Sequence, residues 1–147
     1  MSFSTPTAKP KRPEFRNINA FRDLPGYRWP LASIISGMHR ISGLILFLLM
    51  PFIIWMFATS ITSEYSFARF TAAFSAGMLG LPGAIWKLLA LGVIWAYLHH
   101  FTAGIRHLYM DARHAVTKEF GNSSAVATLI VSLGLTAVLG AKLFGLY

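Results

Sequence analysis

Long apolar runs dominate the pattern of hydrophobic and polar positions along the chain. They extend over about residues 31–60, 83–110 and 124–146. Each run meets the requirement of about 20 mostly apolar residues for crossing the hydrocarbon core of a bilayer as a helix. Irregular chain is excluded there, because backbone polar groups in lipid must be satisfied within the spanning segment. The pattern therefore predicts an all-α membrane protein with three transmembrane helices.

The first 30 residues differ in composition from the rest. They are rich in Pro, Ser and Thr and hold six basic residues against two acidic ones. We interpret residues 1–30 as a basic tail and residues 31–147 as the transmembrane domain. No nucleic-acid recognition fold accompanies the basic tail, so we expect no nucleic-acid partner. A tail that runs directly into the first span favours the bacterial inner membrane over the mitochondrial one.

The distribution of basic residues predicts how the chain is oriented in the bilayer. Cytoplasmic connections carry an excess of Lys and Arg. The tail and the connection between the second and third runs are basic, so we expect both, and hence the N-terminus, to be cytoplasmic. Residues 61–82 are nearly uncharged, and we interpret them as a loop on the outer side. With three spans, Tyr147 should also lie outside.

The overall composition excludes most enzyme classes. The 147 residues are 55% hydrophobic and 12% charged, whereas a soluble domain carries about 25% charged residues. The absence of cysteine excludes a disulfide framework, a thiolate metal site, an iron–sulfur cluster on this chain and c-type haem attachment. The sequence also lacks paired carboxylates, a nucleophile triad and a glycine-rich phosphate loop. We therefore expect no catalysis from this chain alone.

A polar face interrupts the first run near its cytoplasmic end. Ser36, His39, Arg40 and Gly43 follow an i, i+3, i+4, i+7 spacing, which places them on one side of a helix. Ionisable groups inside a span are costly and mark candidate functional sites. This face suits a polar head group with carbonyl acceptors, or a carboxylate. The alternative is that Arg40 extends to the lipid headgroups while His39 contacts a neighbouring helix.

A second polar stripe lies in the second run. His100, Gly104 and His107 follow an i, i+4, i+7 spacing, and His100 lies about 10 Å deeper than His107. The glycine leaves room for a flat group, and a metal is a suitable partner for a buried histidine. A bis-imidazole haem site needs a second ligand from another helix or chain. His39 is no obvious candidate, since it lies near the cytoplasmic edge.

The alternative interpretation of this stripe is a histidine that only forms hydrogen bonds between helices. The adjacent His99 points about 100° away from His100 around a helix. We therefore expect His99 to be a bystander at a helix–lipid or helix–helix boundary.

Two motifs resemble those of the cytochrome b subunit of succinate dehydrogenase, a family of small three-span membrane anchors. The first motif is Arg12-Pro13, then Tyr27-Arg28-Trp29-Pro30, then residues 36–43, which match the pattern Ser-x-x-His-Arg-x-Ser-Gly. The second motif is residues 100–111, which match the family signature of the second span. Together with the three-span layout, the resemblance covers nearly the whole chain after Lys11.

The resemblance implies roles for individual residues. His100 corresponds to an axial ligand of the haem b iron, and Ser36 and Arg40 correspond to residues of the ubiquinone site. His39, Arg40, His107 and Arg106 correspond to positions that bind the haem, near its propionates. The cytoplasmic end of the second span would also face the iron–sulfur subunit. The second axial histidine is expected from a smaller partner anchor subunit, whose helices would complete the bundle.

The same resemblance implies a function within a larger assembly. The chain would anchor a flavoprotein and an iron–sulfur subunit in the bilayer, share haem b with the partner anchor and help to pass electrons from succinate to ubiquinone. This reaction links the respiratory chain to the tricarboxylic acid cycle. Two alternatives stay open. One is the anchor of a quinol:fumarate reductase that runs in the opposite direction, and the other is a haem-free structural anchor in which the histidines only pack.

Overall fold

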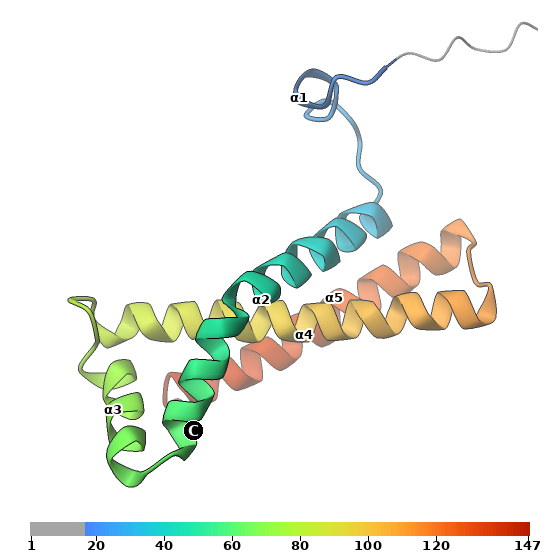
Figure 1. Cartoon of the computed structure of the whole chain (residues 1–147). Helices are drawn as coiled ribbons and strands as arrows, with labels where there is room; N and C mark the ends of the chain where they lie inside the picture. Colours follow the sequence, from blue (N-terminus) through green and yellow to red (C-terminus); the bar gives the residue numbers. More distant parts are fainter. Residues whose placement is uncertain (1–16) are drawn as a thin grey trace, which may run out of the picture.

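The computed structural model describes residues 17–147; the Arg12-Pro13 motif lies outside the described residues. This part of the chain is helical and has no strand beyond one isolated bridge between Met78 and Leu81. Its helices are α1 (Ala20–Asp23), α2 (Leu31–Ile61), α3 (Glu64–Ser75), α4 (Gly83–Arg113) and α5 (Lys118–Leu143) (Figure 1). The predicted all-α class is confirmed.

The helices α2, α4 and α5 are each long and apolar enough to cross a membrane, which confirms the predicted number of spans. Their bounds differ in part from the expected ones, most clearly for α5, which begins at Lys118 instead of at about residue 124. The reason is a local cap. The Thr117 hydroxyl accepts a hydrogen bond from the Phe120 backbone N–H at 3.2 Å, so the helix starts within the polar connection.

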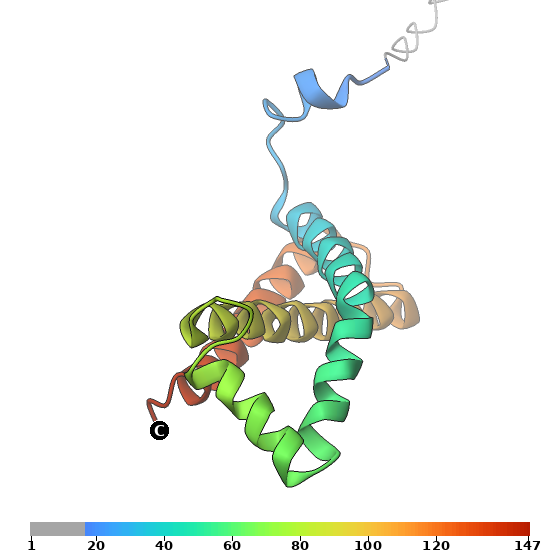
Figure 2. The same ribbon diagram turned by 60° about the vertical axis from the view of Figure 1, so that its left-hand side comes forward.

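The connection between the first two spans contains a helix that the sequence interpretation missed. Ser63 and Ser66 form a reciprocal capping box, in which each hydroxyl accepts a hydrogen bond from the other residue's backbone N–H. Along α3, Phe70 and Phe74 then meet edge to face, with 5.2 Å between ring centroids. Both views show α3 bridging the end of α2 and the start of α4 (Figure 2). A loop over all of residues 61–82 is therefore wrong.

The helix α2 crosses α4 and then diverges from it (Figures 1 and 2). Pro51 lies inside α2. Since proline has no backbone N–H and its ring crowds the preceding turn, it removes one helical hydrogen bond and favours a bend. Figure 2 shows α2 changing direction partway along its length. The N-terminal half of α2 thus packs near α4, while its C-terminal half leads away to α3.

Small residues bring α4 and α5 together. Ala96 and Ala103 of α4 and Ala125 and Ser132 of α5 have no exposed surface. Small side chains allow close backbone approach where lipid removes the hydrophobic drive between helices. The remaining surface of the bundle is strongly apolar, as Phe47 with 71% exposure illustrates. Such a surface fits lipid and further membrane helices.

Candidate functional site

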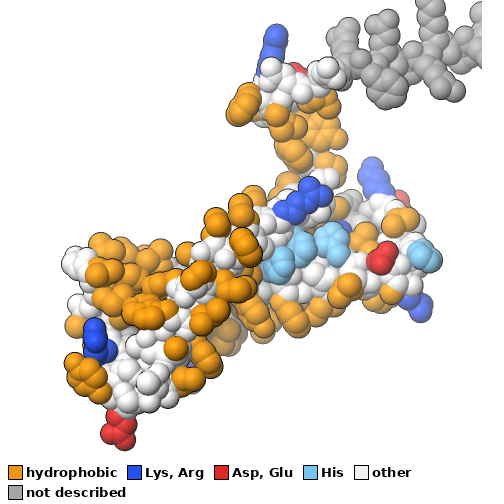
Figure 3. Space-filling view, in the orientation of Figure 1, with side chains coloured by type: hydrophobic (Ala, Val, Ile, Leu, Met, Phe, Trp, Pro, Cys, Tyr) orange, Lys and Arg blue, Asp and Glu red, His pale blue; other side chains and the backbone are white. Residues whose placement is uncertain are grey.

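Three histidines from two helices meet where α2 crosses α4. The ring of His39 stacks on that of His100, with 4.3 Å between centroids and 15° between planes. The ring of His107 also contacts that of His39, with 5.1 Å between centroids and 42° between planes. We call these three residues the histidine cluster. Figure 3 shows histidine side chains gathered on one face, with a cationic side chain beside them and apolar side chains around them.

The crossing depends on a glycine of α2. A Cβ atom at Gly43 would lie 2.8 Å from Cε1 and 3.1 Å from Nδ1 of His100. Any larger residue would therefore overlap the His100 ring. On α4, a Cβ atom at Gly104 would lie 3.7 Å from Nε2 of His39, which is an ordinary van der Waals contact. Gly43 is thus the residue whose missing side chain makes room for the His100 imidazole.

A backbone carbonyl orients the His100 ring. His100 Nδ1 lies 3.0 Å from the carbonyl oxygen of His39. A carbonyl oxygen only accepts hydrogen bonds, so the proton of the neutral imidazole resides on Nδ1. The lone pair is then on Nε2, where it is free to bind a metal. Histidines that bind metals commonly donate their other N–H to such an acceptor.

Ser42 supports this contact and was missed by the sequence interpretation. Its side chain is fully buried, and its hydroxyl donates to the His39 carbonyl oxygen at 2.8 Å. The same oxygen atom of Ser42 lies 3.4 Å from His100 Nδ1. The signal was present in the sequence, because Ser42 follows His39 at the i+3 spacing that shares a helix face.

Ser36 and Arg40 flank the histidine cluster on α2. Ser36 is half-buried and Arg40 is exposed, so both side chains are open to a ligand. Within the cluster, His39 Nε2 is buried and has no hydrogen-bond partner among the described residues. A buried nitrogen without a partner is costly. On the face predicted from Ser36, His39, Arg40 and Gly43, the side chains of Ser36 and Arg40 are therefore accessible to a ligand, whereas His39 Nε2 is not.

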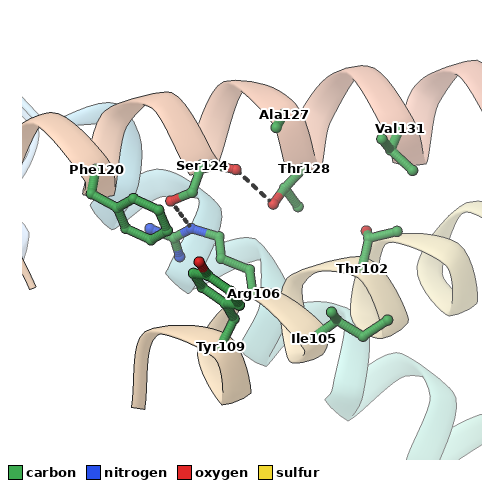
Figure 4. A pocket seen from close by; sticks show the side chains of 9 residues that line it. All are labelled: Thr102, Ile105, Arg106, Tyr109, Phe120, Ser124, Ala127, Thr128 and Val131. Atoms are coloured by element: carbon green, nitrogen blue, oxygen red, sulfur yellow. Dashed lines mark hydrogen bonds between the residues drawn. The ribbon is translucent and has the colours of Figure 1, made fainter. Parts of the chain in front are cut away.

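Arg106 does not join the histidine cluster. It is 8% exposed, and it donates from Nε to the Ser124 hydroxyl at 2.9 Å and from Nη2 to the Gly121 carbonyl at 3.1 Å. Both acceptors belong to α5, and Figure 4 shows the bond to Ser124. Arg106 and His107 are neighbours in sequence, but they point about 100° apart around the helix. The structure therefore places Arg106 at the α4–α5 contact.

The adjacent histidines of α4 have separate environments. His99 is fully buried, and its Nδ1 lies 3.4 Å from the Ser132 hydroxyl oxygen of α5. Its ring stacks on Trp95 at 5.5 Å. His99 thus lies at a helix–helix boundary, one of the two positions expected for it. The geometry distinguishes His100, which faces α2, from His99, which faces α5.

The described residues contain no group of three or more histidine or acidic side chains arranged to hold a metal ion. What the histidine cluster offers is one oriented imidazole with a free Nε2, a half-buried imidazole stacked on it, and a cationic and a hydroxyl side chain beside them. This set of groups fits one face of a haem and a polar head group, and it offers no nucleophile for hydrolysis.

Comparison with known proteins identifies relatives of this chain. Residues 11–139 match the family model described as succinate dehydrogenase/fumarate reductase transmembrane subunit. A succinate dehydrogenase cytochrome b556 subunit from Coxiella burnetii is 35% identical over 75% of this chain and 83% of the relative. A subunit of the same name from Paracoccus denitrificans is 33% identical over 76% and 81%. One from Rickettsia felis is 25% identical over 77% and 82%.

Proposed function

Since the chain belongs to the succinate dehydrogenase/fumarate reductase transmembrane subunit family, we propose that it holds haem b with a second anchor subunit and helps to form a ubiquinone site. The chain is a membrane subunit of the succinate dehydrogenase cytochrome b type. In this proposal the complex oxidises succinate, as the names of the relatives indicate for those proteins, and it uses ubiquinone as the electron acceptor.

The observation that carries the haem proposal is the hydrogen bond from His100 Nδ1 to the His39 carbonyl oxygen. It leaves Nε2 of His100 available as an axial ligand and fixes the plane of the ring. When bound, haem b would supply a one-electron carrier within the bilayer. The second axial imidazole would come from the partner anchor subunit. The side chain of His100 is only half-buried within this chain, which leaves part of it accessible to a partner.

Cationic and hydrogen-bonding groups beside His100 suit the propionates of a haem. His39, His107 and Arg40 lie on the cytoplasmic side of the site in the proposed orientation. Two carboxylates in a low-dielectric site need such partners. Arg106 belongs to the set predicted from the motif, but its hydrogen bonds to α5 occupy it elsewhere. We therefore assign the propionate contacts to His39, His107 and Arg40 first.

Ser36 and Arg40 would bind the quinone head group. A quinone carbonyl oxygen gains negative charge as it is reduced, and a hydroxyl and a guanidinium are donors that stabilise this charge. Both side chains are accessible in the structure. The iron–sulfur and flavoprotein subunits would dock on the same cytoplasmic side. Electrons would then pass from the iron–sulfur subunit to a quinone bound at the same end of the bundle.

Substitution of the quinone residues should separate two activities. We expect Arg40→Leu to lower ubiquinone reduction about 100-fold, because it removes a charged donor to a developing oxyanion, and Ser36→Ala to lower it about tenfold. Succinate oxidation by an artificial acceptor should stay at the wild-type rate in membranes. The exposed Ser33→Ala is the matched control. If both activities fell in parallel, the quinone assignment would be wrong.

The orientation in the membrane has a direct test. The chain contains no cysteine, so single cysteines can be introduced at Leu79 and Val116, which are 83% and 79% exposed in opposite connections. We expect a membrane-impermeant thiol reagent to label Leu79→Cys in intact bacterial cells. Val116→Cys should be labelled only after the inner membrane is opened. The reverse pattern would overturn the proposed cytoplasmic N-terminus.

Two alternatives predict different results. A fumarate reductase anchor would serve a complex that oxidises menaquinol, which quinone-specific assays in membranes would show. A haem-free anchor would leave the purified complex without a haem b spectrum, which a pyridine haemochrome measurement would show. The oriented Nε2 of His100 is the observation that favours the haem-binding form.

A further inference from the structure

A groove runs between α4 and α5 (Figure 4). At 100° per residue, its α4 residues Ile105 and Tyr109 lie on the side of the helix opposite to His100 and His107. Its volume is about 360 Å³. Arg106, Tyr109, Phe120 and Ser124 line one end, and Ala127 and Val131 lie toward the other (Figure 4). Most of this lining is apolar, and Arg106 with Ser124 marks what we call its polar end. No residue of the histidine cluster lines the groove, so it is separate from the proposed haem and quinone sites.

The polar end holds a buried cation that lacks a counter-charge in the described part of the chain. Arg106 donates to a hydroxyl and to a backbone carbonyl, and neither of these acceptors is charged. A guanidinium has five N–H donors, so it retains donors beyond these two bonds. A charge at this depth is costly unless an anion pairs with it. The site therefore favours an anionic ligand.

The position of Arg106 along the helix matches the level of lipid headgroups. The helix α4 ends at Arg113, which puts Arg106 about 10 Å in from the helix end. At the same end, where α4 connects to α5, the exposed cations Arg113 and Lys118 are balanced by the exposed acids Asp111 and Glu119. The attraction for an anion therefore comes from Arg106 itself, whose level suits a phosphate at the cytoplasmic surface better than a neutral head group.

The apolar end of the groove opens to the lipid-facing surface. Ile105 is 51% exposed and Val131 is 48% exposed, and Ala127 between the helices leaves a shallow path. Tyr109 and Phe120 stack at 5.7 Å and close the groove beside Arg106. An acyl chain fits such a path, since it needs apolar contact along its length and no hydrogen bonds.

We propose that the α4–α5 groove binds one anionic phospholipid, with its phosphate on Arg106 and an acyl chain along Ala127 and Val131. The lipid would supply the charge that Arg106 lacks and would join the ends of α4 and α5 on the cytoplasmic side. This site goes beyond the proposed electron-transfer function and does not depend on it, because no residue of the histidine cluster lines the groove.

The test measures phospholipid retained by the purified whole complex. The complex is extracted from bilayers of equal phosphatidylglycerol and phosphatidylcholine and analysed by native mass spectrometry. We expect one phosphatidylglycerol per copy of this chain to be retained. Ala127→Phe fills the groove without touching the hydrogen bonds of Arg106, and Arg106→Gln removes the charge. Arg106→Gln should lower retention about tenfold, the effect of losing one charge-assisted contact. Ala127→Phe should lower retention at least as much, because its ring takes the space of the acyl chain.

The matched control is Ile130→Phe, which places the same phenyl group on an exposed part of α5 outside the groove and should leave retention unchanged. Equal retention by Ala127→Phe and the wild type would overturn the proposal. So would preferential retention of phosphatidylcholine. If Ala127→Phe instead displaced the partner anchor subunit at unchanged lipid content, a protein helix and not a lipid would occupy the groove. The haem spectrum serves as an independent reading, so failure here leaves the haem proposal standing.

Discussion

The His100→Ala complex is expected to contain no haem b above background. The substitution removes the only imidazole of the histidine cluster whose Nε2 is freed by a hydrogen bond from its own Nδ1 to a backbone carbonyl. A low-spin haem with two histidine ligands loses one of its two protein bonds to iron in this variant. The measurement is the pyridine haemochrome content of the purified complex, relative to its flavin content.

His99→Asn is the matched control for this experiment. The amide keeps a hydrogen-bonding group opposite the Ser132 hydroxyl, which His99 Nδ1 now faces at 3.4 Å. The variant therefore alters the neighbouring histidine while the α4–α5 contact is retained, and we expect a wild-type haem content. Full haem in His100→Ala, or loss in His99→Asn alone, would show that the wrong histidine of the doublet has been assigned.

The second large effect is expected from a single methyl group at Gly43. In Gly43→Ala the new Cβ atom would lie 2.8 Å from Cε1 of His100, so the ring must tilt or the helices must separate. Either movement breaks the hydrogen bond to the His39 carbonyl. Loss of such an orienting contact lowers metal affinity about 10–100-fold. We expect a matching fall in haem affinity, measured by titrating haem into the purified complex.

Gly37→Ala on the same helix is the control for Gly43→Ala. Beyond its chain neighbours and the local helix backbone, no atom lies within 4 Å of the position its Cβ would take, so the substitution tests helix propensity without a steric effect. We expect wild-type haem binding. Succinate oxidation by an artificial acceptor shows that each variant complex is assembled. An assembled Gly43→Ala complex with wild-type haem affinity would contradict the packing described at the crossing of α2 and α4.

Periodicity and hydropathy were sufficient to predict the spans. Each of the helices α2, α4 and α5 overlaps most of an apolar run, because length and apolarity decide whether a segment can satisfy its backbone in lipid. The helix α3 was not predicted from hydropathy. Its cue is local, a capping box of Ser63 and Ser66, and a nearly uncharged connection of modest length resembles a loop when only hydropathy is considered.

Contacts between helices could not be predicted from spacing on each helix. The helical spacing places His100 and His107 on one stripe and His39 on another, near the cytoplasmic edge, and gives no indication that the rings of His39 and His100 touch. The structure stacks them at 4.3 Å. The level at which α2 crosses α4 depends on where Gly43 permits close approach, and a single helical pattern carries no information on that register.

Arg106 is a second residue whose contacts could not be predicted from the spacing on one helix. The motif predicts it beside His107 at the haem, but adjacent helical residues point about 100° apart, and α5 supplies acceptors on that side. The polar groups of α5 look like packing residues in the sequence. Only their placement opposite Arg106 reveals that they bind a buried cation.

The most direct test of the central claim, that His100 Nε2 is a haem ligand, is chemical rescue of His100→Gly. The complex is purified with and without imidazole, and the optical spectrum of its haem is recorded. We predict that the low-spin bis-imidazole spectrum is lost in the variant and returns when imidazole enters the space left by the side chain. A low-spin bis-imidazole spectrum in His100→Gly without added imidazole would contradict the account.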